Sequence, residues 1–197
     1  MSEIGLRDWR KLAQAWHARF GTKSLAEGVG FVQAVAEACS AADVVPELRL
    51  GATFVDVVSR DAAAAERISG IAVEYGLPAD PSAVAQLEVG LDTWDLVAIG
   101  PFWAAVLTGS PDSFKGNDIV DPTGRVANLW FQGTTPHETP RQRFHLDLWL
   151  PSEVVPSRIE AAIAAGGKVV YDQEAPAFTV LADPHGNKVC LCTAEGR

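Results

Sequence analysis

The order strand, helix and then three strands occurs twice in the second part of this chain, and this repetition limits the fold more than any other feature. The first copy begins with a strand near Val84–Leu91 and ends in an extended segment at 126–132. The second copy begins with the strand RFHLDLWL at 143–150. A turn of the form Asp-Pro-x-Gly precedes the last strand of each copy, as DPTG at 121–124 and DPHG at 183–186. Such turns are common, but their recurrence at matching places predicts two paired βαβββ modules.

The residues ahead of this repeat predict a smaller α+β unit. Apolar residues at helical spacing predict a first helix over 9–20, and the capping-box pattern SLAE at 24–27 predicts a second one. A strand is expected from Leu48. Asp61 is expected to cap a third helix, which Gly76 ends.

The segment LPADPSA at 77–83 is rich in proline and small residues, which is typical of a linker. We therefore predict one domain over residues 1–78 and a second over residues 79–197. The fold class of the whole chain is expected to be α+β.

Charge and composition exclude several classes of protein. The formal net charge is −9, so the chain lacks the basic surface that nucleic acids and anionic membranes require. No stretch approaches the roughly 20 apolar residues of a membrane span, and the N-terminus does not look like a signal peptide. The three cysteines are few and odd in number, which favours reduced thiols and a cytoplasmic location.

The second part of the chain resembles the glyoxalase-like branch of the vicinal oxygen chelate (VOC) superfamily. The resemblance rests on FWAAVLTG in the first helix, RFHLDLWL opening the second copy and DPHGNKVCL closing it, and it covers about residues 83–195. It implies that the two modules enclose a cleft between curved strands. It also implies that metal-dependent members place one ligand on the first strand and one on the last strand of each module.

The N-terminal part is similar to pterin-4a-carbinolamine dehydratase across about residues 20–76, through FVQAVAEACSAADVVPELRLGATFVDVVSRD and the helix after it. That family has His-His-Pro where this chain has Val44-Val45-Pro46, and a further histidine where it has Arg60. Imidazole suits proton transfer near neutral pH, whereas valine cannot transfer protons and arginine stays protonated. The resemblance therefore implies a retained fold with lost dehydratase chemistry.

Strand alternation separates the side chains of RFHLDLWL into two sets. His145, Asp147 and Trp149 share one face, and the apolar residues between them share the other, which is expected to pack under helices. By the resemblance, the ligand positions of the two modules fall on Glu88, Asn128, His145 and Cys190, although a two-residue slip would put Gln86 in place of Glu88.

This set is short of good metal ligands, because it has one carboxylate, one imidazole, one thiol and a weak amide. A divalent metal held by His145 and Glu88 is therefore not favoured, and the cofactor is unknown. His145 could instead be a hydrogen-bonded pocket histidine, or it could act as a base or substrate anchor.

The residues expected to carry function lie on the inferred inner face of the second domain. His145 and Glu88 are the candidate catalytic groups. The candidate substrate-binding residues are Asn128, Trp130, Gln132, Asp147 and Trp149.

Other residues have plainer interpretations. Phe102 and Trp103 are expected to fill the core, and His17 is expected on the surface of the first helix. His185 lies in a turn, and His137 lies in a polar loop that could cover the cleft.

These observations leave three functions open. The preferred one is a glyoxalase-like protein that binds a small organic molecule between its modules, with lyase, isomerase or dioxygenase chemistry. A ligand-binding or resistance protein without turnover is the alternative, so the sequence does not decide whether the chain is an enzyme. Dehydratase activity of the N-terminal part comes third. A homodimer is expected by analogy with both families.

Overall fold

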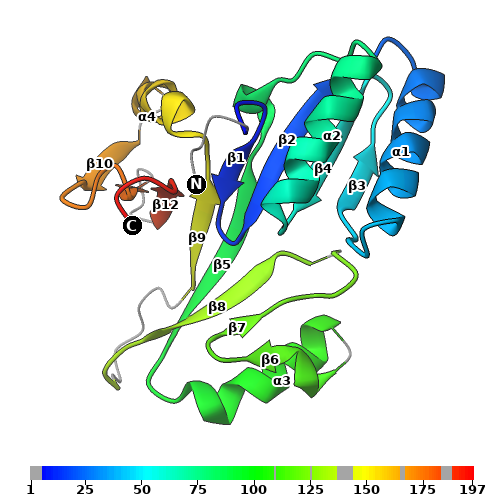
Figure 1. Cartoon of the computed structure of the whole chain (residues 1–197). Coiled ribbons are helices and arrows are strands. Elements are labelled where there is room, and N and C mark those ends of the chain that lie inside the picture. Colours follow the sequence, from blue (N-terminus) through cyan, green and yellow to red (C-terminus); the bar gives the residue numbers. More distant parts are fainter. Residues whose placement is uncertain (1–5, 109, 125, 137–143, 165–166, 183–187) are drawn as a thin grey trace. The chain divides into compact units, whose positions relative to one another are not determined.

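The computed structural model of the chain describes residues 6–108, 110–124, 126–136, 144–164, 167–182 and 188–197. The chain forms two compact units (Figure 1). One contains the described residues up to Ala85 together with Leu150–Val155, and the other contains Gln86–Trp149 and Pro156–Arg197. None of the helices in the described residues is long and apolar enough to cross a membrane.

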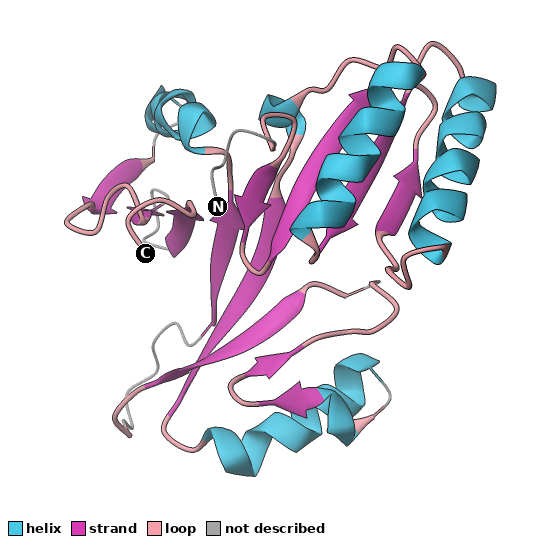
Figure 2. Cartoon of the chain, viewed as in Figure 1, coloured by secondary structure: helices cyan, strands magenta, loops and turns pink. Residues whose placement is uncertain are grey.

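The first unit is a four-stranded sheet with two helices. The strands follow the order β1-β2-β4-β3, and all neighbours are antiparallel. Figure 2 shows the two helices beside the strands. A core of fully buried side chains, among them Phe20, Phe31 and Ile68, joins the helices to the sheet. The elements are β1 (Arg10–Leu12), β2 (Ala15–Gly21), α1 (Leu25–Ser40), β3 (Glu47–Leu50), β4 (Phe54–Ser59), α2 (Ala62–Glu74) and a 3-10 turn η2 (Pro81–Ala83).

The predicted first helix is wrong, because residues 9–20 form the hairpin of β1 and β2 instead. The apolar positions in this segment also fit a strand, since Trp16, Ala18 and Phe20 alternate and face the helices. The hydrogen-bonded pairing of β2 with β4 favours the strand over the helix for this segment. His17 is consequently not on a helix surface; it lies in β2 and is only 8% exposed.

Both helix starts in this unit agree with prediction. The Ser24 hydroxyl accepts a hydrogen bond from the Glu27 amide at 3.2 Å, and the Asp61 carboxylate accepts one from the Ala64 amide at 2.6 Å. The predicted strand from Leu48 is a hairpin of two strands, because the chain turns at residues 51–53.

Alanine substitutions at two glycines, one inside α2 and one just after it, are expected to change stability in opposite directions. Gly70 lies exposed inside α2, and a Cβ there would meet nothing within 4 Å. Gly76 follows the helix with φ +67°, and its amide donates to the Val73 carbonyl in a Schellman-type end. We expect Gly70→Ala to raise the free energy of unfolding by about 0.5–1 kcal/mol, because alanine loses less backbone entropy. Gly76→Ala should lower it by about 1–2 kcal/mol through left-handed strain. Urea unfolding of both variants checks this, and equal effects would contradict it.

The second unit is an eight-stranded sheet with the order β10-β11-β12-β9-β5-β8-β7-β6. Its centre is the antiparallel pair β5–β9, in which Glu88 lies opposite Asp147. Outward from each central strand, the first neighbour is parallel and the next two are antiparallel. The elements are β5 (Gln86–Thr93), α3 (Leu96–Thr108), η3 (Pro111–Ser113), β6 (Phe114–Lys115), β7 (Asp118–Ile119), β8 (Asn128–Gly133), β9 (Phe144–Trp149), η4 (Ser152–Val154, placed with the first unit), α4 (Val155–Ala164), β10 (Lys168–Tyr171), β11 (Phe178–Ala182) and β12 (Lys188–Cys192).

One face of this sheet packs against α3. Leu91, Leu129 and Phe131 form a buried cluster with Ala104 of α3, and Trp103 packs against it, as expected for a core residue. The side chain of Phe102 lies outside the described residues, as do His137 and His185.

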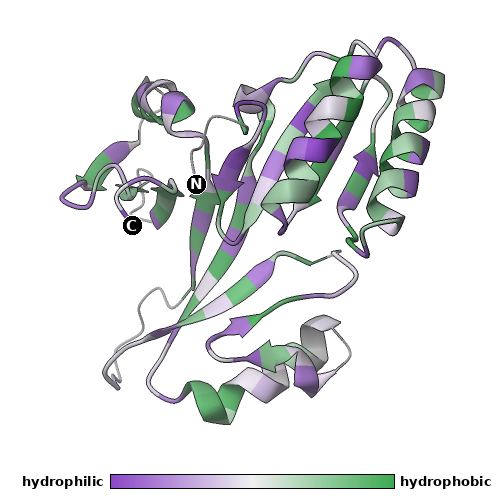
Figure 3. Ribbon diagram, viewed as in Figure 1, coloured by the Kyte–Doolittle hydropathy of each residue, from purple (hydrophilic) through white to green (hydrophobic). Residues whose placement is uncertain are grey.

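The apolar face of β9 is less covered than predicted. Phe144 is 42% exposed and Leu146 is 45% exposed, although Trp103 of α3 packs edge-on against the Phe144 ring. Burial is greater on the other face of this strand, where Asp147 and Trp149 are each 6% exposed. Figure 3 shows the alternation of polar and apolar residues along the central strands.

Candidate functional site

Strand alternation brings the polar side chains of the eight-stranded sheet to the face opposite α3, which we call the polar face. Every second residue of four adjacent strands contributes to it. Its members are Glu88, Gly90 and Asp92 of β5, Asn128, Trp130 and Gln132 of β8, His145, Asp147 and Trp149 of β9, and Cys190 and Cys192 of β12.

The pairing register arranges these residues in rows across the strands. Asn128, Glu88, Asp147 and Cys190 are consecutive cross-strand partners and form one row. His145 lies in the next row, opposite Gly90. Three of the four predicted ligand positions, all except His145, therefore lie in one row, and Asp147 is the fourth residue of that row.

Glu88 is held by two side-chain donors. Asn128 Nδ2 donates to its Oε1 at 3.1 Å, and Trp149 Nε1 donates to its Oε2 at 2.8 Å. Burial raises the pKa of Glu88, the two hydrogen bonds oppose that rise, and the nearby Asp147 charge adds to it. Glu88 is only 4% exposed, and its carboxyl group thus keeps a proton to higher pH than that of a solvated glutamate.

Asp147 is anchored in the same way by the second indole. Trp130 Nε1 donates to Asp147 Oδ2 at 2.7 Å, and the Cys190 thiol also lies within hydrogen-bonding reach of this carboxylate. Both tryptophans therefore present an N–H group to a buried carboxylate. Their polar edges are fixed, as the burial of an indole requires.

His145 lies between two carboxylates. Its Nδ1 is 3.7 Å from Asp92 Oδ1, and its Nε2 is 3.6 Å from Asp147 Oδ1. The Trp130 ring meets the imidazole edge to face, with ring centroids 5.3 Å apart. The side chain is 17% exposed, so it is neither fully packed nor free in solvent.

Two residues of this arrangement were missed by sequence reasoning. Gly90 leaves the space that the imidazole fills, since a Cβ at this position would overlap the His145 ring. Asp92 Oδ1 is buried, and no donor among the described residues forms a hydrogen bond with it. Both could have been found from their spacing of two and four residues after Glu88, which puts them on the same face.

Gln132 lies at the margin of the polar face. It is the cross-strand partner of Asp92, and its side chain is exposed. The predicted substrate-binding residues therefore share one face of the sheet, with Gln132 more open to solvent than the others.

The described residues do not fit a metal ion well. Among them, no three His, Cys, Asp or Glu side chains are grouped in a way that could hold one. Both oxygens of Glu88 already accept hydrogen bonds from the protein. We therefore derive no step through a metal held by His145 and Glu88.

The cysteines of β12 should be unreactive. Burial raises the pKa of both Cys190 and Cys192 to about 12, and the Asp147 charge adds to the shift. At pH 8, about one thiol in ten thousand would then be ionised, and the thiolate is the reactive form. We expect a disulfide reagent to modify both at least a hundredfold more slowly than free cysteine.

All three thiols are free in the structure, so all three should react once the protein is denatured in guanidinium. Rapid modification of Cys190 or Cys192 in the folded protein, located by mass spectrometry, would contradict the prediction.

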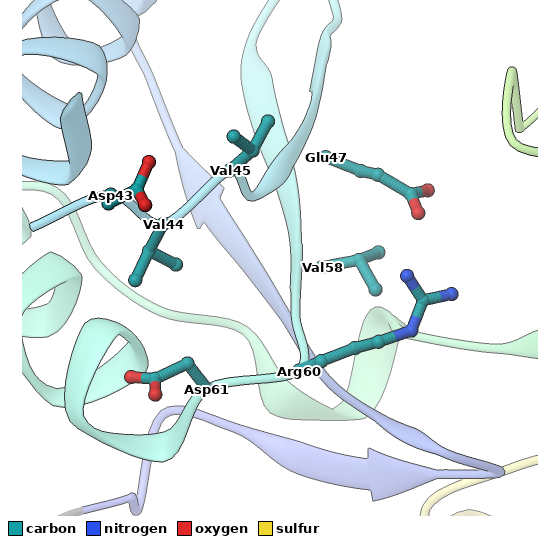
Figure 4. Close-up of a pocket in the computed structure, with 7 residues that line it drawn as sticks. All are labelled: Asp43, Val44, Val45, Glu47, Val58, Arg60 and Asp61. Atoms are coloured by element: carbon teal, nitrogen blue, oxygen red, sulfur yellow. The ribbon is translucent and has the colours of Figure 1, made fainter.

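The first unit contains a separate pocket of about 320 Å³ (Figure 4). It lies where α1 leads into β3 and where β4 leads into α2. Valine side chains line part of it, and the long side chain of Arg60 extends along another part. The lining residues are Asp43, Val44, Val45, Glu47, Val58, Arg60 and Asp61.

The fold and the polar face define a mixed α and β protein whose central strands carry buried carboxylates, indoles and an imidazole on one side. The model of the glyoxalase-like domain matches residues 88–192, more than half of the sequence, and the chain belongs to this family. The matched segment begins at Glu88 and ends at Cys192, so it spans the polar face. No curated protein matches the chain.

Proposed function

We propose that the second unit consists of two paired βαβββ modules and binds a small organic molecule at the polar face. The main support is the position of His145, which lies between Asp92 and Asp147 and against the Trp130 ring. The equivalent strand order outward from β5 and β9 supports the pairing of modules. On this proposal, Trp130 and Trp149 supply the apolar contact area, and the exposed Gln132 is a polar contact at the margin.

His145 and Glu88 are suited to proton transfer in this proposal. A carboxyl group whose pKa is raised by burial can donate a proton at a pH where an ordinary glutamate is already ionised. The ring nitrogens of His145 lie 3.7 Å and 3.6 Å from the two carboxylates, and the neutral imidazole keeps one unprotonated nitrogen that can accept a proton from a bound compound. We therefore favour isomerase or lyase chemistry that begins with removal of a proton next to a carbonyl group.

This function can be tested with a panel of small carbonyl compounds. Binding is followed through the indole N–H signals of Trp130 and Trp149, and proton removal is followed as deuterium uptake by the bound compound in heavy water. We expect His145→Gln to abolish deuterium uptake while changing affinity less than tenfold. Gln33→Ala is the control, because Gln33 is an exposed glutamine of α1 in the first unit.

Two outcomes would change the conclusion. Binding without deuterium uptake by the wild-type protein would favour the alternative, a protein that sequesters its ligand without turnover. A panel that leaves both indole signals unchanged would contradict the proposed site.

We also propose that residues 1–78 are a dehydratase-like module that has lost its chemistry, followed by a second domain from residue 79. The pocket of the first unit supports this, because Val44, Val45 and Arg60 line it and are the positions where the resembled family has histidines. A carbinolamine dehydration assay on the full chain should show no turnover. Turnover that Arg60→Ala removes would overturn the inferred loss of activity. The expected homodimer and cytoplasmic location are likewise proposals, and sedimentation equilibrium tests the first.

A further inference from the structure

We propose that the pocket of the first unit binds a small zwitterion with an aliphatic side chain, which is the chemistry of an aliphatic α-amino acid. The inference goes beyond the proposed function, because it concerns the first unit and makes no use of the polar face. It rests on a cavity of about 320 Å³ that combines an apolar wall with a carboxylate and a guanidinium on the same side (Figure 4).

Three valines from two parts of the first unit form the apolar wall of this pocket. Val58 lies on β4, and Val44 and Val45 follow α1. Val45 is 93% exposed, the highest value for a large apolar residue in the described part of the chain. An aliphatic side chain laid against these methyl groups would remove apolar surface from water, which favours binding.

The end of α1 fixes the position of Val44 and Val45 in the free protein. Asp43 has a left-handed backbone with φ +53°. The Val44 amide donates to the Cys39 carbonyl at 3.1 Å, and the Asp43 amide donates to the Ser40 carbonyl at 3.3 Å. These are the two hydrogen bonds of a Schellman motif. A wall that is already ordered loses less conformational entropy when a ligand binds.

The strand register places two charged side chains on either side of Val58. Glu47 of β3 is the cross-strand partner of Val58, and Arg60 follows Val58 by two residues, so alternation gives all three side chains the same face. Diagonal neighbours across an antiparallel pair lie about 7–8 Å apart. Figure 4 shows the Glu47 carboxylate and the Arg60 guanidinium extending to the same side of the pocket.

These two charged groups are not used by the protein itself. Within the described part of the chain, no ion pair or side-chain hydrogen bond involves Glu47 or Arg60. The carboxylate of Asp61 is different, because it accepts the Ala64 amide at 2.6 Å and points away from Arg60 in Figure 4. Glu47 and Arg60 are therefore available to bind opposite charges of one ligand.

A zwitterion matches this arrangement better than an ion of either sign. An ammonium group can donate to the Glu47 carboxylate, and a carboxylate can accept two parallel hydrogen bonds from the Arg60 guanidinium. An α-amino acid carries both groups on one carbon, and its side chain can then lie on the valines. Three acidic residues and one basic residue line the pocket, so a ligand with only a carboxylate fits least well.

Leucine and two analogues of its branched skeleton test the proposal. Isocaproate lacks the ammonium group of leucine, and isoamylamine lacks its carboxylate. Each compound is titrated into the full chain, and the methyl signals of Val44, Val45 and Val58 are followed by NMR. We expect leucine to bind at least tenfold more tightly than isoamylamine, and isocaproate to bind most weakly. Glycine, which keeps both charges without the side chain, should bind at least tenfold more weakly than leucine.

Neutral variants assign each charge of the ligand to one residue. Glu47→Gln should weaken leucine binding at least fivefold without weakening isocaproate. Arg60→Gln should weaken leucine binding at least fivefold without weakening isoamylamine. Glu74→Gln and Arg67→Gln are the matched controls, because they make the same exchanges at exposed positions of α2, and they should leave all affinities unchanged.

Several results would overturn the inference. Equal affinity for leucine and its analogues would exclude recognition of both charges, and leucine binding unchanged in Glu47→Gln or Arg60→Gln would exclude the assigned contacts. Absence of leucine binding would exclude the site, as would leucine binding that shifts the indole signals of Trp130 and Trp149 instead of the valine methyl signals. The proposed function of the polar face is decided separately by the carbonyl panel.

Discussion

Replacing Gly90 with alanine is expected to displace the His145 imidazole and to reduce the deuterium uptake proposed for the polar face at least tenfold. A Cβ at this position would overlap the ring, and the neighbouring Trp130 ring and two carboxylates limit where the imidazole can move. Overpacking of this kind costs about 1–3 kcal/mol of stability when the ring stays in place. If the ring is displaced instead, the proposed proton removal is lost.

Gly133→Ala is the matched control for this substitution. Gly133 lies at the end of β8 in the same sheet, and a Cβ there would meet nothing within 4 Å. The contact between His145 and Trp130 can be followed by the ring-current shift of the imidazole protons, without a ligand. An unchanged imidazole spectrum in Gly90→Ala, with unchanged stability, would show that the two residues are not packed together.

Acidification from pH 7 to pH 4 is expected to remove about 3 kcal/mol of stability through His17 alone. Burial lowers the pKa of His17 to about 4, although a hydrogen bond to the Leu12 backbone and the Asp56 charge oppose the shift. The unfolded chain binds a proton near pH 6.5, whereas the folded chain does so only near pH 4. Stability is therefore full above pH 6.5 and falls by about 3 kcal/mol as the pH drops to 4.

His17→Gln isolates this contribution, because glutamine can still donate to the Leu12 carbonyl but does not titrate. In urea titrations, the unfolding free energy of the wild type minus that of the variant should fall by about 3 kcal/mol when the pH is lowered from 7 to 4. Glu88 acts in the opposite direction, since its raised pKa adds stability as the pH falls, but it is common to both proteins and cancels. A difference that does not vary with pH would show that His17 is hydrated in the folded protein.

The sequence predicted the second unit better than the first, for a physical reason. Along β9, alternation over six residues separates His145 and Asp147 from Leu146 and Leu148, and only a strand produces that separation. In the segment 9–20, apolar residues fit both a helix and a strand. The choice there depends on pairing with β4, which lies more than thirty residues away in the chain.

The candidate site was only partly predictable for a related reason. Alternation places His145 and Asp147 on one face of β9, and it places Glu88 and Asp92 on one face of β5. The row in which each residue stands depends on the cross-strand register, which a single sequence does not reveal. The placement of His145 opposite Gly90, one row away from Glu88, therefore required the structure.

The seam between β5 and β9 joins strands from different halves of the second unit, and each half contributes two members of the row that contains Glu88 and Asp147. A fragment that ends after β8 would carry Asn128 and Glu88 without their counterparts. It would also leave one edge of β5 with unpaired backbone groups, which invites pairing with another fragment. Splitting the unit at this seam should thus yield aggregation-prone pieces that each carry half of the row, and mixing the two pieces offers a route to reassemble it.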